Sequence, residues 1–378
     1  MVGVLFGIYL AQQGLPPARI GLIVALGLTG GALAALLVTL FGDHLGRRAA
    51  LLTLSLFSAA GGVVVAFSTG DWLLAAGAFI GMVNGMGRDR GAAQVLEQAL
   101  LPATVSNRQR TRAIAWYSVL QDLGHAAGAL LAALPTVLQH AGVTEFAALR
   151  VALLFYAALQ AASGIAYLRM PVVAPSPAAV RVRVSAHTRR ILWKVSSLFA
   201  LDSLGGGFLT TSLLSFFFFE RFAVSAATIG VLFAAARTAN AFSHLGAAWL
   251  AARIGLVNTM VFTHIPSSLL LVTVAVVPSF PIAAALFLLR ESLVEMDVPT
   301  RQSYLMAVVR PEERTVSTGV THLVRLGGWA VAPAAAGVLM QGIGLALPLF
   351  IGAGMKISYD LLLYVSFRAH KPPEELRQ

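Results

Sequence analysis

The chain has 378 residues, of which 58% are hydrophobic and only 11% are charged. A soluble protein needs roughly 25% charged residues to cover its surface, so this composition excludes an ordinary soluble protein and indicates a surface that faces lipid. The net charge of +11 would suggest nucleic-acid binding in a soluble protein. In a membrane protein the positions of the charges matter more than their sum, and no nucleic-acid partner is expected.

The chain contains no cysteine, which excludes disulfides, thiolate metal sites and thiol nucleophiles. Its eight histidines are scattered and show no spacing typical of a metal site, and no GxxxxGK[ST] or GxSxG motif occurs. The sequence therefore predicts no metal, no cofactor and no enzymatic activity.

Apolar runs of about 20 residues, the length that crosses a bilayer as a helix, indicate eleven spans. They fall at residues 18–41, 49–67, 72–98, 112–135, 146–168, 191–219, 226–250, 257–277, 281–305, 315–340 and 344–367. Residues 1–11 are also apolar but rise only about 16 Å as a helix. They can be read as a signal-peptide remnant, an interfacial helix or a truncated first span. No basic segment precedes them, and we favour the truncated span, which makes twelve.

A basic stretch with three prolines, residues 170–185, separates six spans from six and is typical of a cytoplasmic connector. We divide the chain into an N-terminal six-helix half (1–169), a linker (170–190), a C-terminal six-helix half (191–369) and a tail (370–378). Seventeen basic residues fall in loops on the linker's side, against three (Arg19, Arg150 and Arg221) on the other. This bias predicts that the linker and both termini are cytoplasmic.

The two halves resemble each other when the sequence is shifted by 204 residues. Residues 103–111 then align with 307–315, and Gly124 falls on Gly328. Parallel repeats of six helices are a transporter architecture whose site lies between the halves near mid-membrane.

The loop after the second span reads T-L-F-G-D-H-L-G-R-R from Thr39 to Arg48. Gly46 permits a tight turn, Arg47 and Arg48 suit the headgroup layer, and Asp43 can pair with a helix N-terminus or an arginine. With twelve spans in 6+6 order, this loop resembles the signature loop of the major facilitator superfamily. The equivalent loop of the second half, residues 251–255, keeps only a trace of it.

This resemblance implies an all-α polytopic membrane protein with the major facilitator fold, in which two six-helix bundles enclose a central cavity. It implies that Asp43, Gly46, Arg47 and Arg48 latch the halves in the outward-facing state. It further implies a monomer in the bacterial inner membrane that moves a small-molecule substrate. The drug-antiporter pattern G-x-x-x-G-P is incomplete, because no proline follows Gly128.

Seven basic and eight acidic residues lie inside the predicted spans. Ionisable side chains at membrane depth usually face a cavity or a partner. Asp122, Asp202 and Glu291 lie near mid-membrane and are candidates for proton coupling, since burial raises a carboxyl pKa and favours proton binding. His125 lies one turn from Asp122 and is a candidate to share its proton or contact substrate.

Three central arginines, Arg237, Arg290 and Arg325, are candidates to bind an anionic substrate. The alternative is that each neutralises a nearby carboxylate. Asn240 and Tyr9 are candidates for polar lining of the substrate site.

Glu97, Asp297 and Arg301 lie near cytoplasmic span ends and are candidates for ion pairs. Asp297 and Arg301 are four residues apart on one helix and can pair with each other. Glu97 and Arg301 occupy equivalent repeat positions, which also suggests a pair across the halves.

We therefore predict a secondary active transporter that moves a small organic solute by alternating access, driven by proton exchange. Efflux of amphipathic compounds is the leading interpretation, and organic-anion transport through the central arginines is the alternative. A non-transporting sensor or scaffold of the same fold is a further alternative. The charges inside the spans argue against it, because a scaffold would not need them.

Overall fold

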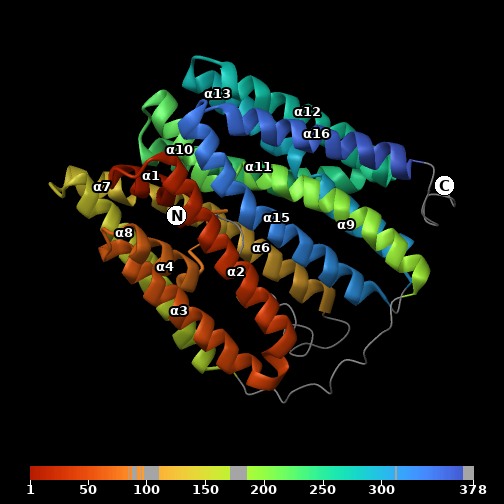
Figure 1. The fold of residues 1–378 in the computed structure, drawn as a ribbon, viewed down its shortest axis with the longest axis horizontal. Coiled ribbons are helices and arrows are strands. Elements are labelled where there is room, and N and C mark those ends of the chain that lie inside the picture. Colours follow the sequence, from red (N-terminus) through yellow and green to blue (C-terminus); the bar gives the residue numbers. More distant parts are fainter. Residues whose placement is uncertain are drawn as a thin grey trace. The chain divides into compact units, whose positions relative to one another are not determined.

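The computed structural model describes residues 1–83, 85–86, 92–94, 96–97, 110–170, 185–310 and 313–368. Some side chains within these ranges, those of Asp43 and Asp122 and most of 110–119 among them, lie outside the description. The described residues form helices and short connections (Figure 1).

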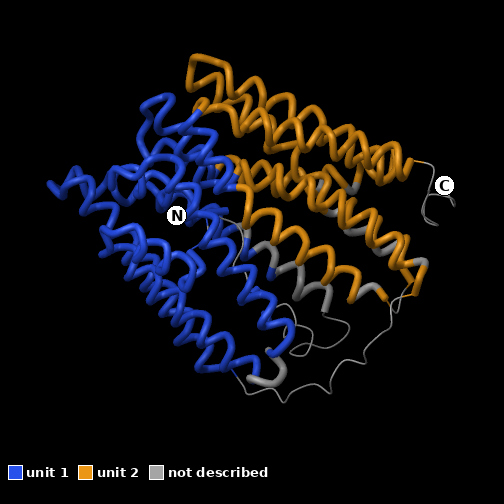
Figure 2. Tube along the Cα trace, viewed as in Figure 1, with its two compact units in different colours: residues 1–179, 210–234, 333–342 blue, residues 180–209, 235–332, 343–378 orange. Residues whose placement is uncertain are grey.

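Two compact units divide the chain (Figure 2). Unit 1 comprises Met1–Ala179, Thr210–Ala234 and Pro333–Gly342, and unit 2 comprises Val180–Leu209, Ala235–Ala332 and Ile343–Gln378. Unit 1 therefore contains segments from both halves of the sequence. Whether the halves 1–169 and 191–369 are the bodies that move stays a prediction.

The helices before the linker follow the predicted spans closely where hydrophobicity is continuous. They are α1 (Val2–Gln12), α2 (Pro17–Leu45), α3 (Arg47–Phe67), α4 (Asp71–Gly81), α6 (Arg110–Leu130), the 3-10 turn η1 (Leu131–Ala133), α7 (Leu134–His140) and α8 (Glu145–Leu168).

The helices after the linker are α9 (Ala186–Gly207), α10 (Thr211–Phe222), α11 (Ala226–Ile254), α12 (Leu256–Val276), α13 (Phe280–Val294), α14 (Asp297–Val308), α15 (Arg314–Gly342) and α16 (Leu347–Phe367). Seven stretches in the described part of the chain are long and apolar enough to cross a membrane. The count of twelve spans stays a prediction.

Several predicted spans are interrupted, which corrects the expectation of continuous helices. Helix α4 ends at Met82, whose backbone is left-handed with φ of 51°. The span 191–219 breaks between α9 and α10, where Thr210 starts a new helix by accepting a hydrogen bond from Leu213 N at 3.3 Å. The span 281–305 breaks at residues 295–296, between α13 and α14.

Within unit 1, helix α3 packs against α4 and α8, α2 packs against α4, and α1 packs against α10. The Ser212 hydroxyl of α10 donates to Gly3 O of α1 at 2.9 Å, and Ser212 N donates to Gly85 O at 2.9 Å. A segment from after the linker is therefore tied by hydrogen bonds to the first-half helices inside this unit.

Within unit 2, helix α12 packs against α13, α14 and α16, and α16 packs against α9. Their shared core includes Phe199, Met260, Tyr304 and Tyr359, all nearly inaccessible. Helix α9 carries Gly205–Gly207, and glycine there permits close approach. An ideal Cβ on Gly205 would lie 3.0 Å from Gly352 O of α16. These contacts bring α9, α14 and α16 together around the charged residues that they carry.

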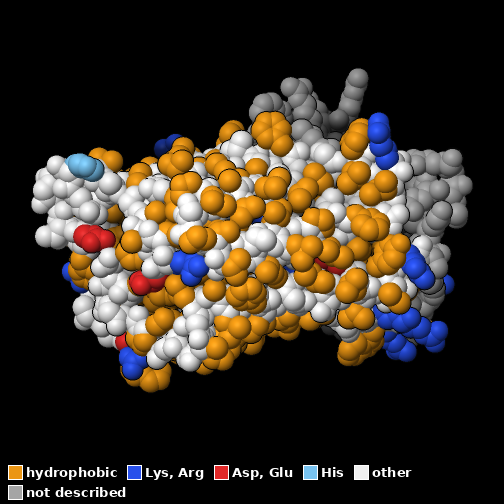
Figure 3. All heavy atoms as spheres, turned by 90° about the horizontal axis from the view of Figure 1, so that it is seen from above, with side chains coloured by type: hydrophobic (Ala, Val, Ile, Leu, Met, Phe, Trp, Pro, Cys, Tyr) orange, Lys and Arg blue, Asp and Glu red, His pale blue; other side chains and the backbone are white. Residues whose placement is uncertain are grey.

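The accessible surface of the described residues carries many large hydrophobic side chains, several of them more than half exposed (Figure 3). Trp72 is 89% exposed, Phe242 69% and Val365 73%. Such a surface would aggregate in water, so it supports an integral membrane protein.

Candidate functional site: a buried charged network

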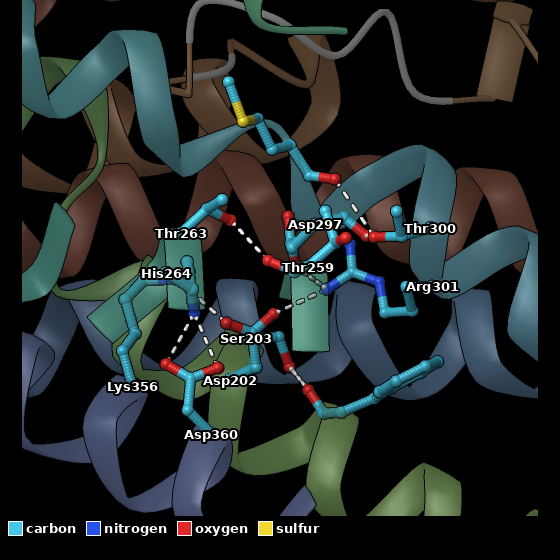
Figure 4. A network of polar contacts seen from close by, with 12 residues as sticks. Asp202, Ser203, Thr259, Thr263, His264, Asp297, Thr300, Arg301, Lys356 and Asp360 are labelled. Atoms are coloured by element: carbon cyan, nitrogen blue, oxygen red, sulfur yellow. Dashed lines mark hydrogen bonds and ion pairs between the residues drawn. The ribbon is translucent and has the colours of Figure 1, made fainter. Parts of the chain in front are cut away.

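Asp202 of α9 lies at the centre of a buried polar network in unit 2 (Figure 4). One carboxylate oxygen accepts from Lys356 Nζ of α16 at 2.8 Å, and the other accepts from Arg301 Nη1 of α14 at 3.1 Å. Arg301 Nη1 also lies 2.8 Å from Asp297 Oδ2, which is the i, i+4 pair that the sequence predicts. Asp202 therefore connects three helices by charge-assisted hydrogen bonds.

His264 of α12 forms the second part of the network (Figure 4). Its Nδ1 lies 3.0 Å from both carboxylate oxygens of Asp360 on α16. The two side chains are 1% and 0% exposed, so this pair has no contact with water in the structure. The pair therefore fixes α12 to α16 through a contact enclosed by protein.

Lys356 joins the two parts, because its Nζ also lies 3.4 Å from His264 Nε2. A protonated lysine can only donate hydrogen bonds, so this contact suits a His264 tautomer whose Nε2 accepts from Lys356 and whose Nδ1 donates to Asp360.

The network has three carboxylates, those of Asp202, Asp297 and Asp360, and two basic side chains in direct contact with Asp202, those of Arg301 and Lys356. Buried charges are stable only when they are balanced. The charge of Arg325 on α15 also acts on Asp202 and Asp297, so three cations balance the three carboxylates when His264 is neutral.

The sequence is similar to known proteins along most of its length. Residues 1–333 match the Major Facilitator Superfamily pattern. The chain belongs to the major facilitator superfamily. It is also 23% identical to the Saccharomyces cerevisiae membrane protein YJR124C, over 92% of this chain and 86% of that one.

Solved transporters share the fold. A bacterial homologue of the human lysosomal transporter Spinster, in an inward-facing and occupied conformation, gives a TM-score of 0.68 at 15% identity, covering 97% of this chain and 90% of that one. The nucleoside transporter NupG gives 0.74 at 14% identity, covering 97% and 94%. The human organic anion transporter MFSD10 gives 0.59 at 20% identity, covering 94% and 87%. The chain therefore has the transporter fold, and its family and structural neighbours indicate a transporter and not an enzyme.

Glu291, another predicted coupling residue, lies outside this network. Its carboxylate pairs with Arg290 and accepts from Asn240 Nδ2 at 3.0 Å. All three residues are buried in unit 2. The contacts support the alternative interpretation of Arg290, in which it neutralises a carboxylate, and Asn240 is bonded within this cluster.

The two remaining central arginines are partly exposed. Arg237 lies on α11, and Arg325 lies on α15 with its guanidinium carbon 4.6 Å from the centre of the Trp329 ring. The Arg325 Nε is buried and has no hydrogen-bond partner. Neither arginine's role in substrate binding is tested by these contacts.

Tyr9 was a candidate for polar lining, and the structure buries it completely in unit 1. Its hydroxyl donates to Val65 O at 2.9 Å and Ala66 O at 3.1 Å, and its ring stacks on Phe146 at 5.7 Å. These contacts fix α1 against the end of α3 and support a structural role.

Glu97 accepts hydrogen bonds from the hydroxyls of Tyr117, at 2.6 Å, and Tyr167, all within unit 1. Glu97 and His125 line a cavity of about 640 Å³ in the same unit. The predicted proton-coupling side chain of Asp122 lies outside the described residues. The predicted pair between Glu97 and Arg301 stays a prediction.

The superfamily's signature loop joins α2 to α3. Gly46 has a positive φ of 79°, so it forms the tight turn that the sequence predicts. Arg47 and Arg48 begin α3, while the Asp43 side chain lies outside the described residues. Gly255, between α11 and α12, has a φ of 87°. The degenerate second loop therefore keeps the same backbone turn, and the latch role stays a prediction.

Outside the spans, Glu313 anchors the start of α9. Its carboxylate accepts from the Thr188 hydroxyl and from the backbone N and hydroxyl of Ser185, the N-cap residue of α9. The hydrogen bond from Thr188, followed by those from Ser185, lowers the pKa of Glu313. The first helix after the linker is therefore fixed to the residue that precedes α15.

Three members of the network, His264, Lys356 and Asp360, were not predicted as site residues. Lys356 and Asp360 are spaced i, i+4 in the last span, and this spacing of opposite charges was a usable signal. His264 is a single histidine in an apolar span, and nothing local distinguishes it from a core residue.

Proposed function

We propose that the protein is a secondary active transporter that couples the movement of a small organic solute to proton movement through the Asp202 network. The observation that supports this most strongly is the position of His264 between the Asp360 carboxylate and the Lys356 ammonium group. Superfamily membership and the shared fold support transport itself.

The proton has a specific effect in this arrangement. A proton that binds His264 Nε2 places two positive groups, His264 and Lys356, face to face. Their repulsion moves Lys356 away from the ring and strengthens its interaction with Asp202. Asp202 then binds Arg301 less strongly, because its charge is shared. Proton binding on α12 thereby changes the contacts among α9, α14 and α16.

The direction and cargo are also part of the proposal. We assign efflux of amphipathic compounds from the cytoplasm, driven by proton entry, in a monomer of the plasma membrane. The neighbours of this fold carry different substrates according to their descriptions, namely nucleosides for NupG and organic anions for MFSD10. The organic-anion alternative gains support from Arg325, which is considered below.

The test begins with a thermal-shift screen of the purified protein to find solutes that bind. Proteoliposomes that contain a pH-sensitive dye then report proton movement when a bound solute is added. We expect the wild-type protein to move protons with the solute. Asp202→Asn and Asp360→Asn should abolish transport driven by a pH gradient, while Asp202→Asn retains exchange of solute across the membrane.

Glu220→Gln is the matched control, because Glu220 is an exposed carboxylate at the end of α10. Its transport should equal that of the wild-type protein. Solute transport without any pH change would overturn proton coupling. Unchanged pH-driven transport in Asp202→Asn and Asp360→Asn, with a loss in Glu291→Gln or Asp122→Asn, would move the coupling site elsewhere.

A further inference from the structure

Helix α15 has two exposed faces of different chemistry. One face is apolar and includes Val320, Val331 and Val338, which are 39%, 65% and 59% exposed. The other face carries Thr318, His322, Arg325 and Trp329, which are spaced i, i+4, i+7 and i+11 and are exposed or partly exposed. We call these four residues the polar stripe.

The polar stripe lies at membrane depth. Arg325 is the twelfth residue of α15 and so lies about 16 Å from its start, near the middle of a bilayer. A guanidinium cannot face hydrocarbon at this depth without a large free-energy cost. The apolar face of α15 is therefore the one toward lipid, and the polar stripe faces water.

Arg325 differs from the other buried or central cations of unit 2. Arg301 and Lys356 bind Asp202, and Arg290 binds Glu291. Within the described part of the chain, Arg325 forms neither a hydrogen bond nor an ion pair, and its Nε is buried without a partner. Because Nε is enclosed while the side chain as a whole is partly exposed, the terminal N–H groups are the ones available to an acceptor from outside the chain.

Trp329 provides an aromatic surface next to this charge. The Arg325 guanidinium lies over the indole at 4.6 Å, an arrangement that orients its N–H groups outward in one plane. Trp329 also lies against α9, since an ideal Cβ on Gly206 would be 3.0 Å from Trp329 Nε1 and 4.0 Å from Lys356 Nζ. The indole therefore extends from the unpaired guanidinium to the edge of the charged network.

We infer that Arg325 and Trp329 bind the substrate, and that the substrate is an organic anion with a flat aromatic part. Its carboxylate or equivalent accepts from the two terminal N–H groups of Arg325 in bidentate fashion, and its ring packs on the exposed part of Trp329. This inference rests on the proposed transport function and specifies its cargo.

Binding of three related probes to the purified protein tests the inference by isothermal titration calorimetry. The probes are naphthoate, an aromatic anion; naphthamide, its neutral analogue; and cyclohexanecarboxylate, an aliphatic anion. We expect the wild-type protein to bind naphthoate about tenfold more tightly than naphthamide, because only the anion forms charge-assisted hydrogen bonds.

Arg325→Gln should weaken naphthoate binding about tenfold and leave naphthamide binding unchanged. Trp329→Leu should weaken naphthoate binding several-fold, by about the contribution of one aromatic contact, and leave cyclohexanecarboxylate unchanged. Arg325→Lys keeps the charge but not the bidentate geometry and should give intermediate affinity. Because Arg325 makes no hydrogen bond to any residue that the structure describes, these variants should fold normally.

Arg253 and Trp249 on α11 provide the matched control pair, with the guanidinium 4.2 Å from the ring centre. Trp249 is 57% exposed, and Arg253→Gln and Trp249→Leu should not affect binding. Three results would each overturn the inference. The wild-type protein could bind naphthoate and naphthamide with equal affinity, Arg325→Gln could bind naphthoate as the wild-type protein does, or Arg253→Gln could weaken naphthoate binding as much as Arg325→Gln. If the protein binds none of the probes but transports another solute in response to a pH gradient, the inference about the substrate is wrong and the proposed transport function stands.

Discussion

At the scale of single residues, Asp202 is unusual because two cations compete for one buried carboxylate. Lys356 Nζ and Arg301 Nη1 lie 2.8 and 3.1 Å from its two oxygens. Removing one partner of a buried pair leaves the other uncompensated and costs about 3–5 kcal/mol. The loss is smaller here, since Arg301 remains beside Asp202 when Lys356 is removed.

Lys356→Met should therefore lower the thermal unfolding temperature, and the double variant Asp202→Asn/Lys356→Met should recover most of the loss. The double variant leaves Arg301 paired with Asp297, and His264 with Asp360. Unfolding temperatures of both single variants and the double variant in detergent complete a double-mutant cycle. Strictly additive losses would show that Asp202 and Lys356 do not interact.

The sequence allowed part of this cluster to be predicted. Asp202, Asp297 and Arg301 stand out because a charge within an apolar span is unusual, and the pairing of Asp297 with Arg301 follows from helix spacing. His264 could not be assigned, because its significance depends on Asp360 and Lys356, which lie more than ninety residues away along the chain. Contacts of that kind arise only from helix packing.

At the scale of helices, glycine determines how closely α9 approaches α15. An ideal Cβ on Gly328 would lie 2.3 Å from Ser203 Oγ and 3.0 Å from Leu204 N of α9. Ser203 cannot move aside freely, because its hydroxyl donates to Phe199 O at 2.7 Å. The neighbouring Gly327 has open space, with nothing within 4 Å of an added Cβ.

Gly328→Ala should destabilise the protein by about 1–3 kcal/mol through overpacking. Gly327→Ala should leave stability unchanged or raise it by up to about 1 kcal/mol, because alanine favours helix. Thermal unfolding of the two variants in the same detergent compares them directly. Equal effects of the two substitutions would contradict the close contact between α9 and α15.

Continuous helices were predictable and helix breaks were not. Helices α2, α3, α8, α12 and α16 begin and end within a few residues of the predicted spans. A run of about twenty apolar residues is the length of a helix that crosses the bilayer. The breaks at Met82 and at Thr210 depend on single backbone conformations and caps. An average over hydrophobicity does not detect them.

At the scale of the whole molecule, unit 1 joins helices from both halves of the sequence. Ala18 N of α2 donates to Gln341 Oε1 of α15 at 3.2 Å, and an ideal Cβ on Gly337 would lie 2.3 Å from Pro17 O. Alternating access requires contacts between the halves to open and close. This contact between α2 and the end of α15 is therefore expected to break during transport.

The chain contains no cysteine, so introduced pairs can be crosslinked without background. Crosslinking Ala18→Cys to Gln341→Cys with a short bifunctional reagent should stop transport of a solute found in the binding screen. The control pair is Gln12→Cys with Glu145→Cys, whose native side chains lie 3.0 Å apart within the N-terminal half. Crosslinking the control pair should leave transport intact, and full activity in both crosslinked proteins would rule out opening at this contact.

The boundary between the two units passes through three spans, and the backbone differs at each crossing. Between α9 and α10 the helix is interrupted, in α11 the crossing falls within the alanines 234–236, and in α15 it falls at Pro333. Proline removes one backbone hydrogen bond and bends a helix, and the carbonyl it leaves without this bond is that of Trp329. A ligand that stacks on Trp329 would therefore contact the residue whose carbonyl lacks this hydrogen bond, at the point where α15 passes from one unit to the other.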